Sequence, residues 1–491
     1  MRSYRISRGR GATSWALAIM AGAAAGVSAG RADATEPAIR AADALGDVRA
    51  LAAPALEGRG ALTPGLGEAA RYVARRFAAA GLAPAGDGGT YFQAVEIPLP
   101  RRPSPETRLD LGGEALKLGA DFSPGVGAPA TEARGPIAFA GRCAPSDYGG
   151  LDVGGKLVVC LPDGLPLAAK LDTAVARGAV ALLVVDDGAS PELAPLWPLG
   201  QAGASTIPSF RVRGAVIDRL LAPLRRSVAA LRAPVEPGAR PPAFDVGAWG
   251  GFGLAWVVPA LRGSNVVGVI PGADPALAGE AVLVGAHYDH VGKGDEGGVL
   301  DGPGLHPGAD DNASGTAALL ETAEALAAGP RPRRSILFVA FTGEERGLVG
   351  SIAAAARAPR SVVAMVNFDM VGRMRDRKLE VQGAPTSPAW RAIVEEANAG
   401  RLALAFPSRV SRNSDHAPFI AAGVPALLLH TGMHGDYHRK GDTAEKINAD
   451  GIVEAARLAA GVVRSVADRP ERLSFVGPAW TTVRAGGWGA P

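Results

Sequence analysis

The chain has 491 residues, of which 47% are apolar and 20% charged, a composition typical of soluble globular proteins with a sizeable core. This length predicts two or three domains. The formal net charge is +3, but residues 1–34 contain five Arg and one Asp, so the remainder carries 46 basic and 47 acidic residues. That balance excludes a broad basic surface, and we expect no nucleic acid partner.

Residues 1–34 have the pattern of a signal peptide. Several arginines precede an apolar stretch from 12 to 29, and the sequence ADAT predicts cleavage after Ala34, with VSAG at 27–30 as a second candidate site. A membrane anchor is the alternative, but the stretch is short and rich in Gly and Ala. We therefore expect export to the periplasm or the outside, with no stable membrane insertion after cleavage.

The segments between the predicted signal peptide and residue 250 predict different secondary structures. Apolar residues at helical spacing predict a helix around 66–80. Residues from about 109 to 250 then read as strand, loop, strand, helix and strand, between proline-rich segments at 100–106 and 235–243. Cys143 and Cys160 match no zinc or redox spacing. They are either a disulfide pair or two small buried apolar residues, and we favour the disulfide slightly.

From residue 251 onwards, short apolar runs alternate with helical patterns. The runs do not alternate in polarity, which is typical of strands covered on both faces. They lie at 281–287, 335–341, 362–368, 379–383 and 425–430. Helices are predicted at 315–329 and 451–468. This order predicts an α/β sandwich.

All seven histidines lie between His287 and His438, and polar residues follow several predicted strands. Sites in open α/β sheets form beyond the carboxyl ends of the strands, so these groups can converge. The candidate metal ligands are His287, Asp310, Glu345, Asp369 and His438. Three carboxylates and a hydroxide balance the charge of two divalent cations, and imidazole with carboxylate suits zinc. We therefore expect two Zn²⁺ ions with one shared carboxylate.

Three further residues are candidates for the chemistry of such a site. Glu344 is the spare carboxylate beside a ligand and is predicted to act as general base. Asp289 shares the face of His287 and is expected to accept the other imidazole N–H. Tyr437 offers a phenolic donor for an oxyanion.

Each group also has an ordinary structural explanation. The adjacent Asp310 and Asp311 suit a turn and a helix cap. Glu344 and Glu345 suit the first turn of a helix, and Asp369 a turn at a strand end. Four other histidines are expected to lie outside the ligand set: His290, His306, His430 and His434. Asp415 and His416 are expected to shape the substrate end of the cleft, without an assigned role.

The sequence resembles the M28 family of zinc aminopeptidases over nearly the whole mature chain. The motifs GAHYDH, HPGADDNASG, FTGEERGLVGS, NFDMVG, SDHAPF and DYHRKGDT occur in the family's order, although Arg-Lys stands after the last histidine where many relatives have Thr-Pro. The resemblance implies a three-layer sandwich with a mixed, mostly parallel sheet. It assigns His287 and Asp369 to one zinc, Glu345 and His438 to the other, and Asp310 to both, with the following Asp310–Asp311 peptide in cis.

Residues 109–250 resemble the protease-associated (PA) domain, a smaller β-rich domain often inserted in this family and often covering one side of the cleft. The resulting organisation is a signal peptide (1–34), two peptidase segments (35–108 and 251–470), the insert (109–250) and a tail (471–491) without a recognisable motif. The implied function is hydrolysis of N-terminal residues from peptides. A carboxypeptidase, a glutaminyl cyclase-like enzyme and a receptor-like binding protein remain alternatives, and the oligomeric state is open.

Overall fold

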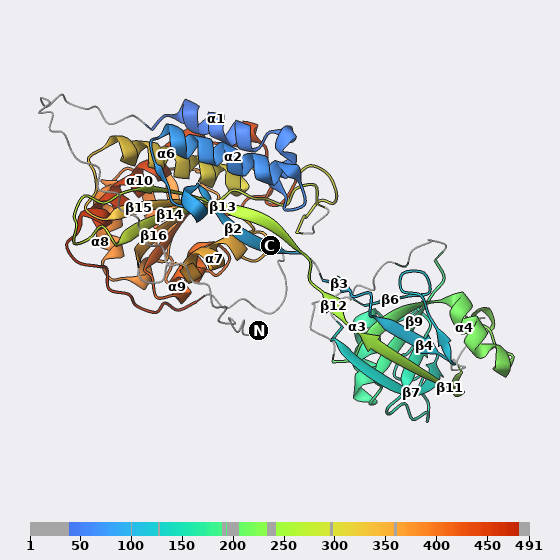
Figure 1. Ribbon diagram of the computed structural model, residues 1–491. Coiled ribbons are helices and arrows are strands. Elements are labelled where there is room, and N and C mark those ends of the chain that lie inside the picture. The colour runs from blue at the N-terminus through green and yellow to red at the C-terminus, as the bar shows by residue number, and fades with distance from the viewer. Residues whose placement is uncertain are drawn as a thin grey trace, which may run out of the picture. The chain divides into compact units, whose positions relative to one another are not determined.

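The computed structural model describes residues 39–99, 101–125, 128–188, 193, 206–232, 242–294, 298–357 and 361–480. The predicted signal peptide lies outside these residues. The chain divides into two compact units (Figure 1). The larger unit contains the chain up to Pro98 and from Ala260 to Thr482, and the smaller unit contains Leu99–Pro259.

A nine-stranded mixed sheet forms the centre of the larger unit, with the order β1-β13-β15-β14-β16-β19-β17-β18, and β2 pairs with β13. Four central strands run parallel: β15 (Ser335–Phe341), β14 (Ala281–His287), β16 (Val362–Phe368) and β19 (Ala426–His430). The others are β1 (Ala83–Pro84), β2 (Phe92–Pro98), β13 (Ala260–Ile270), β17 (Lys378–Gln382) and β18 (Ala403–Ala405). β13 and β17 pair antiparallel with this parallel core.

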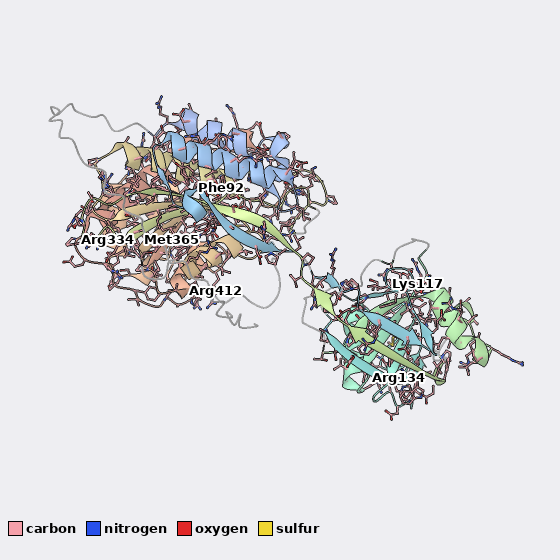
Figure 2. All side chains as sticks on the ribbon, viewed as in Figure 1. Phe92, Lys117, Arg134, Arg334, Met365 and Arg412 are labelled. Carbon is pink, nitrogen blue, oxygen red and sulfur yellow. A yellow bond between two sulfur atoms is a disulfide. The ribbon has the colours of Figure 1, made fainter. Side chains whose placement is uncertain are left out.

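Helices cover both faces of this sheet. One apolar core joins the sheet to α1 (Ala41–Leu51), α2 (Pro64–Ala79), α6 (Gly315–Ala328), α8 (Trp390–Asn398) and α10 (Ala449–Asp468). The other core contains residues of α7 (Val349–Arg357) and α9 (His416–Ala421) together with Met365, which is labelled in Figure 2. Alternate residues of β14 and β15 enter opposite cores, which explains why their sequences are apolar at almost every position. The predicted three-layer α/β sandwich is confirmed.

The smaller unit is a second sheet with the order β5-β4-β11-β7-β8-β9-β10-β6. Its strands are β4 (Arg108–Leu111), β5 (Glu114–Ala115), β6 (Phe122–Pro124), β7 (Thr131–Ala140), β8 (Leu157–Cys160), β9 (Ala181–Asp186), β10 (Ser209–Arg213) and β11 (Ala243–Leu254). Its helices are α3 (Leu167–Ala176), α4 (Gly214–Leu221) and α5 (Val228–Arg232). A separate short ribbon pairs β3 (Arg102–Pro103) with β12 (Trp256–Val257).

The smaller unit extends beyond the predicted range 109–250 at both ends. It does so because β4 pairs with β11 and β3 pairs with β12. Cys143 and Cys160 form a disulfide with Cα atoms 5.7 Å apart. The unit has its own buried apolar clusters, so it possesses an independent core.

Residues 471–480, which were predicted to lie in the tail, cross the surface of the larger unit. The Val476 N–H donates to the Thr386 carbonyl (2.8 Å), and Trp480 pairs with Val410 as an isolated bridge. The side chain of Arg412 lies over the Trp480 ring, 4.4 Å from its centroid. This segment is therefore part of the fold. No helix among the described residues is long and apolar enough to cross a membrane.

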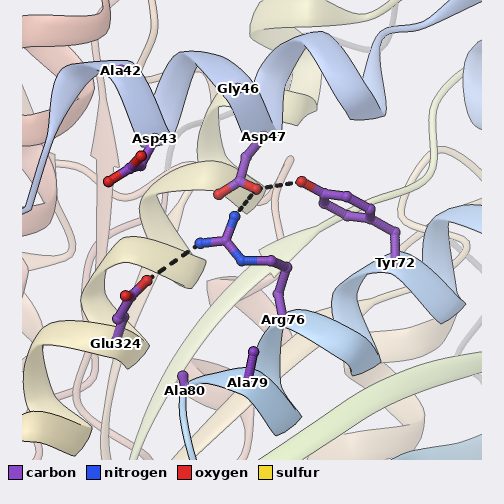
Figure 3. Close-up of a pocket in the computed structure, with 9 residues that line it drawn as sticks. All are labelled: Ala42, Asp43, Gly46, Asp47, Tyr72, Arg76, Ala79, Ala80 and Glu324. Atoms are coloured by element: carbon purple, nitrogen blue, oxygen red, sulfur yellow. Dashed lines mark hydrogen bonds and ion pairs between the residues drawn. The ribbon is translucent and has the colours of Figure 1, made fainter.

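A charged network joins α1 and α2 to α6 beside an open pocket of about 530 Å³ (Figure 3). The fully buried carboxylate of Asp47 accepts hydrogen bonds from Tyr72 (2.5 Å) and from Arg76. Arg76 also lies 3.3 Å from Glu324 and 3.8 Å from the buried Glu321. Burial raises the pKa of Asp47 to about 6 and that of Glu321 to about 7, and the carboxylate of Asp47 raises the pKa of Glu321 further.

Candidate metal centre

The parallel strands bring their carboxyl ends to one edge of the sheet, where the candidate residues meet. His287 is the last residue of β14, and Asp369 follows β16. Glu344 and Glu345 follow β15 through the Thr342–Gly343 turn, in which Gly343 has a φ of 66°. Three separate strands thus deliver four polar side chains to the same edge.

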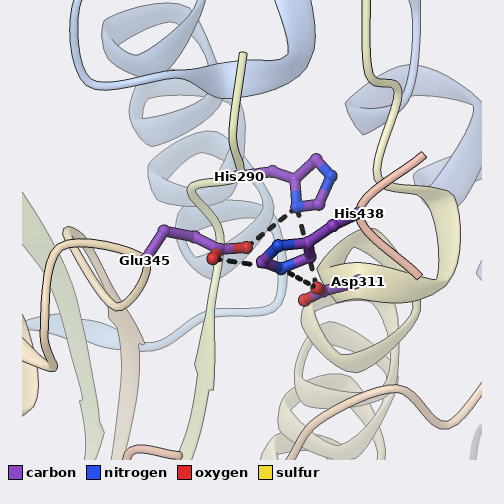
Figure 4. A group of neighbouring side chains, drawn as sticks. All are labelled: His290, Asp311, Glu345 and His438. Carbon is purple, nitrogen blue, oxygen red and sulfur yellow. Dashed lines mark hydrogen bonds and ion pairs between the residues drawn. The ribbon is translucent and has the colours of Figure 1, made fainter. Parts of the chain in front are cut away.

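Asp311 lies between two groups of possible ligands. Its Oδ1 is 3.4 Å from Nε2 of His287, which in turn is 3.5 Å from Oδ1 of Asp369. Its Oδ2 is 3.1 Å from Nε2 of His438, which is 3.2 Å from Oε2 of Glu345. Figure 4 shows the second group, to which His290 also contributes. The two carboxylate oxygens of Asp311 are therefore divided between two histidine–carboxylate groups.

This arrangement contradicts the prediction for Asp310, which is displaced by one residue from the position between the two groups. The Asp310 Oδ2 accepts from Nε2–H of His434 (3.0 Å). Its Oδ1 accepts from Oγ–H of Ser314 (3.0 Å) and from N–H of Gly372 (2.6 Å). Both of its oxygens thus accept from protein donors, and neither belongs to the two candidate ligand groups of the described residues. The cis peptide likewise lies at Asp311–Asn312 and not at Asp310–Asp311.

The turn that carries these two carboxylates is held by side chains from distant segments. One oxygen of Asp442 accepts both the Asp310 N–H (2.9 Å) and the Asp311 N–H (3.1 Å), and its other oxygen accepts from Arg373 (2.9 Å). The side chain of Asn312 donates to the carbonyl of Phe368 at the end of β16 (3.0 Å). These bonds fix the π-helical turn Ala309–Ser314 before α6 begins.

Asp289 has a different role from the one predicted. Its carboxylate lies 3.9 Å from Nδ1 of His287, whereas its own carbonyl lies 3.2 Å from that nitrogen and is the nearer acceptor. The carboxylate instead accepts the N–H groups of Glu344 (3.1 Å) and Glu345 (3.3 Å). Asp289 therefore orients the loop that carries the two glutamates.

His438 is fixed by an acceptor on its second nitrogen. Nδ1–H of His438 donates to the Gly298 carbonyl (2.7 Å), so Nε2 is the nitrogen directed at the carboxylates. Nδ1 of His290 lies 3.0 Å from Oε1 of Glu345, so His290, predicted to lie outside the ligand set, belongs to the site. Such outer hydrogen bonds set the tautomer and orientation of metal-binding side chains.

The buried charges produce opposite pKa shifts in neighbouring glutamates. Burial raises the pKa of Glu344 well above its usual value, and Glu345 and Asp415 raise it further. Burial also acts to raise the pKa of Glu345, but His438 and His290 together hold it well below its usual range. Burial would lower the pKa of His438, yet Glu345 and Asp311 raise it to about 11. Glu344 is thus the more basic of the two carboxylates.

Tyr437 stacks on His438, with ring centroids 3.9 Å apart. Burial and the surrounding carboxylates, led by Asp311, raise the pKa of its phenol. The group is therefore held in its protonated form and can donate a hydrogen bond.

The donor set fits a pair of metal ions. Ligand atoms about 2.0–2.1 Å from a tetrahedral zinc ion lie roughly 3.3 Å from one another. The separations of 3.1–3.5 Å around Asp311 match that spacing. Burying several carboxylates side by side costs free energy unless cations compensate their charge. The histidines of the two groups do not supply enough positive charge to do so. The residues are His287, Asp311 and Asp369 in one group, and His290, Asp311, Glu345 and His438 in the other.

Sequence reasoning missed Asp311, Asp442, His290 and His434. Nothing in two adjacent aspartates distinguishes which one faces the histidines. The signal for Asp442 was its place in the DYHRKGDT motif, four residues after His438. Asp415 of the SDHAPF motif is close enough to Glu344 to raise the pKa of that carboxylate, and burial raises the pKa of Asp415 itself to about 7.

Comparison with known proteins gives family assignments for both units. Residues 265–463 match the family model of peptidase family M28, and residues 132–220 match that of the PA domain. A probable lipoprotein aminopeptidase, LpqL, of Mycobacterium tuberculosis is 25% identical over 384 residues, which cover 69% of this chain and 68% of the relative. Leupeptin-inactivating enzyme 1 of Streptomyces exfoliatus is 32% identical over 196 residues, which cover 38% of this chain and 39% of the relative.

Among solved structures, a zinc aminopeptidase from Bacillus subtilis has a similar fold. The TM-score is 0.52 at 20% sequence identity, and the match covers 90% of this chain and 98% of that protein. At this identity the likeness concerns the fold.

Proposed function

Because the chain belongs to peptidase family M28 and contains a PA domain, we propose that it is an aminopeptidase whose metal centre holds two zinc ions. One observation carries the proposal: Asp311 presents one oxygen to the His287–Asp369 group and the other to the His438–Glu345 group. A carboxylate shared in this way is the geometry that a pair of adjacent cations requires. The names of the relatives, which include aminopeptidases and zinc metalloproteases, support the same activity.

Each polar group has a task in peptide hydrolysis. Bound zinc ions supply Lewis acidity toward a carbonyl oxygen and lower the pKa of water. The Glu344 carboxylate accepts the proton of the attacking water and delivers it to the departing amine. Asp289 holds the main chain of Glu344 and Glu345 in place. The Tyr437 hydroxyl donates to the oxygen on which negative charge develops.

The test combines metal analysis with paired substrates. Purified protein should contain two zinc ions per chain and should hydrolyse aminoacyl amides that have a free amino group. The same amides with a blocked amino group should be cleaved at least 100-fold more slowly, and chelation should abolish activity that added zinc restores. Equal cleavage of blocked and free substrates would exclude an exopeptidase, and a single zinc ion would favour a cyclase-like enzyme.

We also propose that the protein is exported. The leader pattern of residues 1–34 supports this, and so does the Cys143–Cys160 disulfide, because disulfides persist mainly in oxidising compartments. Sequencing of the purified native protein should find Thr35 at its N-terminus. An intact Met1 in a cytoplasmic fraction would contradict the proposal.

A further inference from the structure

Arg59 is a fully buried arginine directly behind the metal centre, and neither the motifs nor the proposed mechanism uses it. It ends the short 3₁₀ segment Pro54–Arg59 and has a φ of 51°. Its neighbour Gly58 approaches main-chain atoms so closely that a Cβ there would lie 2.4 Å from the His306 carbonyl oxygen and 2.6 Å from that of Gly292. The loop is therefore pressed against the segments that lead into the site.

Among the described residues, the guanidinium of Arg59 donates only to main-chain carbonyls. It reaches Leu51 at the end of α1 (2.7 Å), Tyr288 (2.7 Å), Pro307 (2.8 Å) and Gly308 (2.8 Å). A planar guanidinium can serve several acceptors in fixed directions, which an ammonium group cannot do. One side chain thus joins three segments that are distant in sequence.

Two of these segments carry candidate metal ligands, one from the first group and one that both groups share. Tyr288 directly follows His287, and Gly308 lies three residues before Asp311. The two arms of Arg59 therefore fix the distance between the strand end that supplies His287 and the turn that supplies Asp311. The Arg59 carbonyl also accepts the His290 N–H (3.3 Å), which adds a second contact with the segment that follows β14.

The charge of Arg59 matters as well as its shape. No carboxylate is among the hydrogen-bond acceptors described for the guanidinium. Burial lowers the pKa of Arg59 to about 10, and the carboxylates of Asp311, Asp289, Asp442 and Glu345 act to raise it. A buried positive charge is normally costly unless it is compensated. Here the acidic cluster of the metal centre compensates it, so the cation and the cluster stabilise each other.

We propose that Arg59 is a positioning residue that pre-forms the metal centre by holding the His287 and Asp311 segments at their bound spacing. The inference rests on the proposed function, because it assumes that these residues bind zinc. It predicts that Arg59 contributes to zinc affinity without touching zinc or substrate. Outer-layer partners of metal ligands typically change affinity by 10–100-fold.

Arg334 provides a matched control. It is 1% exposed and also donates to main-chain carbonyls, those of Val466 (3.3 Å), Arg469 and Pro470 (3.2 Å), as well as to Glu280. It directly precedes β15 and so lies at the amino-terminal end of that strand, whereas the site lies at the carboxyl ends of the strands. Arg334 is labelled in Figure 2. Replacing either arginine by lysine removes a buried guanidinium network, but only one of them lies behind the metal centre.

The experiment measures zinc binding itself, by competition with a chromogenic chelator, for the wild type, R59K, R59Q and R334K. Thermal unfolding of the zinc-free proteins gives the structural cost of each substitution. We expect the zinc Kd to rise about 10–100-fold in R59K and further in R59Q, while R334K stays within twofold of the wild type. At saturating zinc, R59K should recover most of kcat with little change in KM.

Several results would overturn the proposal. One is an R59K zinc Kd within twofold of the wild type, and another is equal weakening in R334K. Failure of both Arg59 variants to unfold cooperatively when R334K does so would make the residue purely structural. A wild type that binds zinc but cleaves no peptide refutes the proposed function while the affinity comparison still decides the role of Arg59. A wild type that binds no zinc refutes both.

Discussion

Two adjacent side chains, Asp310 and Asp311, receive entirely different partners within one turn. Asp310 accepts three protein donors, whereas Asp311 faces two histidines. The difference arises because the main chain changes direction between them: Asp311 has φ −105° and ψ 96°, outside the helical region. Backbone direction, and not residue type, decides which carboxylate can be shared by two cations.

The pair can be separated by substitution. D311N should lose zinc, with at most one ion retained, because an amide is a poor bridging ligand for two cations. D310N should retain both ions and lose about 1–3 kcal/mol of stability, since its NH₂ group would face the His434 donor. Zinc content after dialysis and thermal unfolding measure the two effects. Loss of zinc in D310N with retention in D311N would restore the bridging role predicted for Asp310.

The adjacent glutamates separate in a similar way. E344Q should keep its zinc and its KM within a few-fold but lose kcat by about 10²–10⁴-fold, because the amide cannot accept a proton. E345Q should lose zinc, since its carboxylate faces His438 and His290. Zinc content and steady-state kinetics measured on the same preparations distinguish the two. An active E344Q enzyme would remove Glu344 from the role of general base.

The sequence predicted which segments supply the site better than it predicted the roles of single residues. His287, Glu345, Asp369 and His438 follow recognisable strand or motif ends, and the structure brings them together. Asp311, His290 and Arg59 could not be predicted because their roles depend on backbone dihedral angles and on contacts with segments up to 249 residues away. Metal binding by the assembled set stays a prediction.

Among the elements, the strands that are covered on both faces matched their predicted bounds best. β14, β15 and β16 begin and end at the predicted residues because every residue in them is buried and nearly all are apolar. β17 at the margin of the sheet is shifted by one residue and has a mixed burial pattern. A strand that is buried on both faces has a continuous apolar run, so its bounds can be predicted from the sequence. A strand with one exposed face contains polar residues, so its ends are harder to predict.

The contact between α1, α2 and α6 should make stability depend on pH. The folded protein holds the pKa of Glu321 at about 7, above its ordinary value of 4.5, so the folded state binds this proton more tightly than the unfolded state does. The resulting stability is fully present below about pH 4.5 and is lost as the pH rises through about 7. Each pKa unit corresponds to about 1.4 kcal/mol, so the loss between pH 5 and pH 8 is on the order of 1–3 kcal/mol.

E321Q tests this element because it removes the titrating group. The free energy of unfolding of E321Q, taken relative to that of the wild type, should be higher at pH 8 than at pH 5. Chemical denaturation at both pH values measures this difference. E324Q is the control, since Glu324 lies on the same helix but its side chain is 51% exposed. Parallel pH profiles for the wild type and E321Q would show that the buried carboxylates do not govern this contact.

At the scale of the whole molecule, the two units have separate apolar cores and different stabilising devices. The larger unit contains the metal centre, and the smaller unit contains the Cys143–Cys160 disulfide. A ligand that binds only the folded state raises the stability of the unit that binds it. A disulfide stabilises mainly by constraining the unfolded chain of its own unit.

Calorimetry should therefore resolve two transitions that respond to different changes. Removal of zinc should lower the midpoint of one transition and leave the other in place. The double variant C143A/C160A should lower only the second, by roughly 2–4 kcal/mol in stability for a closed loop of this size. If both treatments shift both transitions equally, the units unfold as one cooperative body.

The Arg59 contacts also affect the order in which the two units fold during synthesis. The guanidinium donates to Pro307, 248 residues further along the chain, and the whole smaller unit is synthesised in between. While the ribosome extends the chain, the contiguous stretch from Leu99 to Pro259 can complete its own core, but the first helices have nothing to pack against. The larger unit therefore completes its core last, and the nascent enzyme remains inactive until most of the chain has been translated.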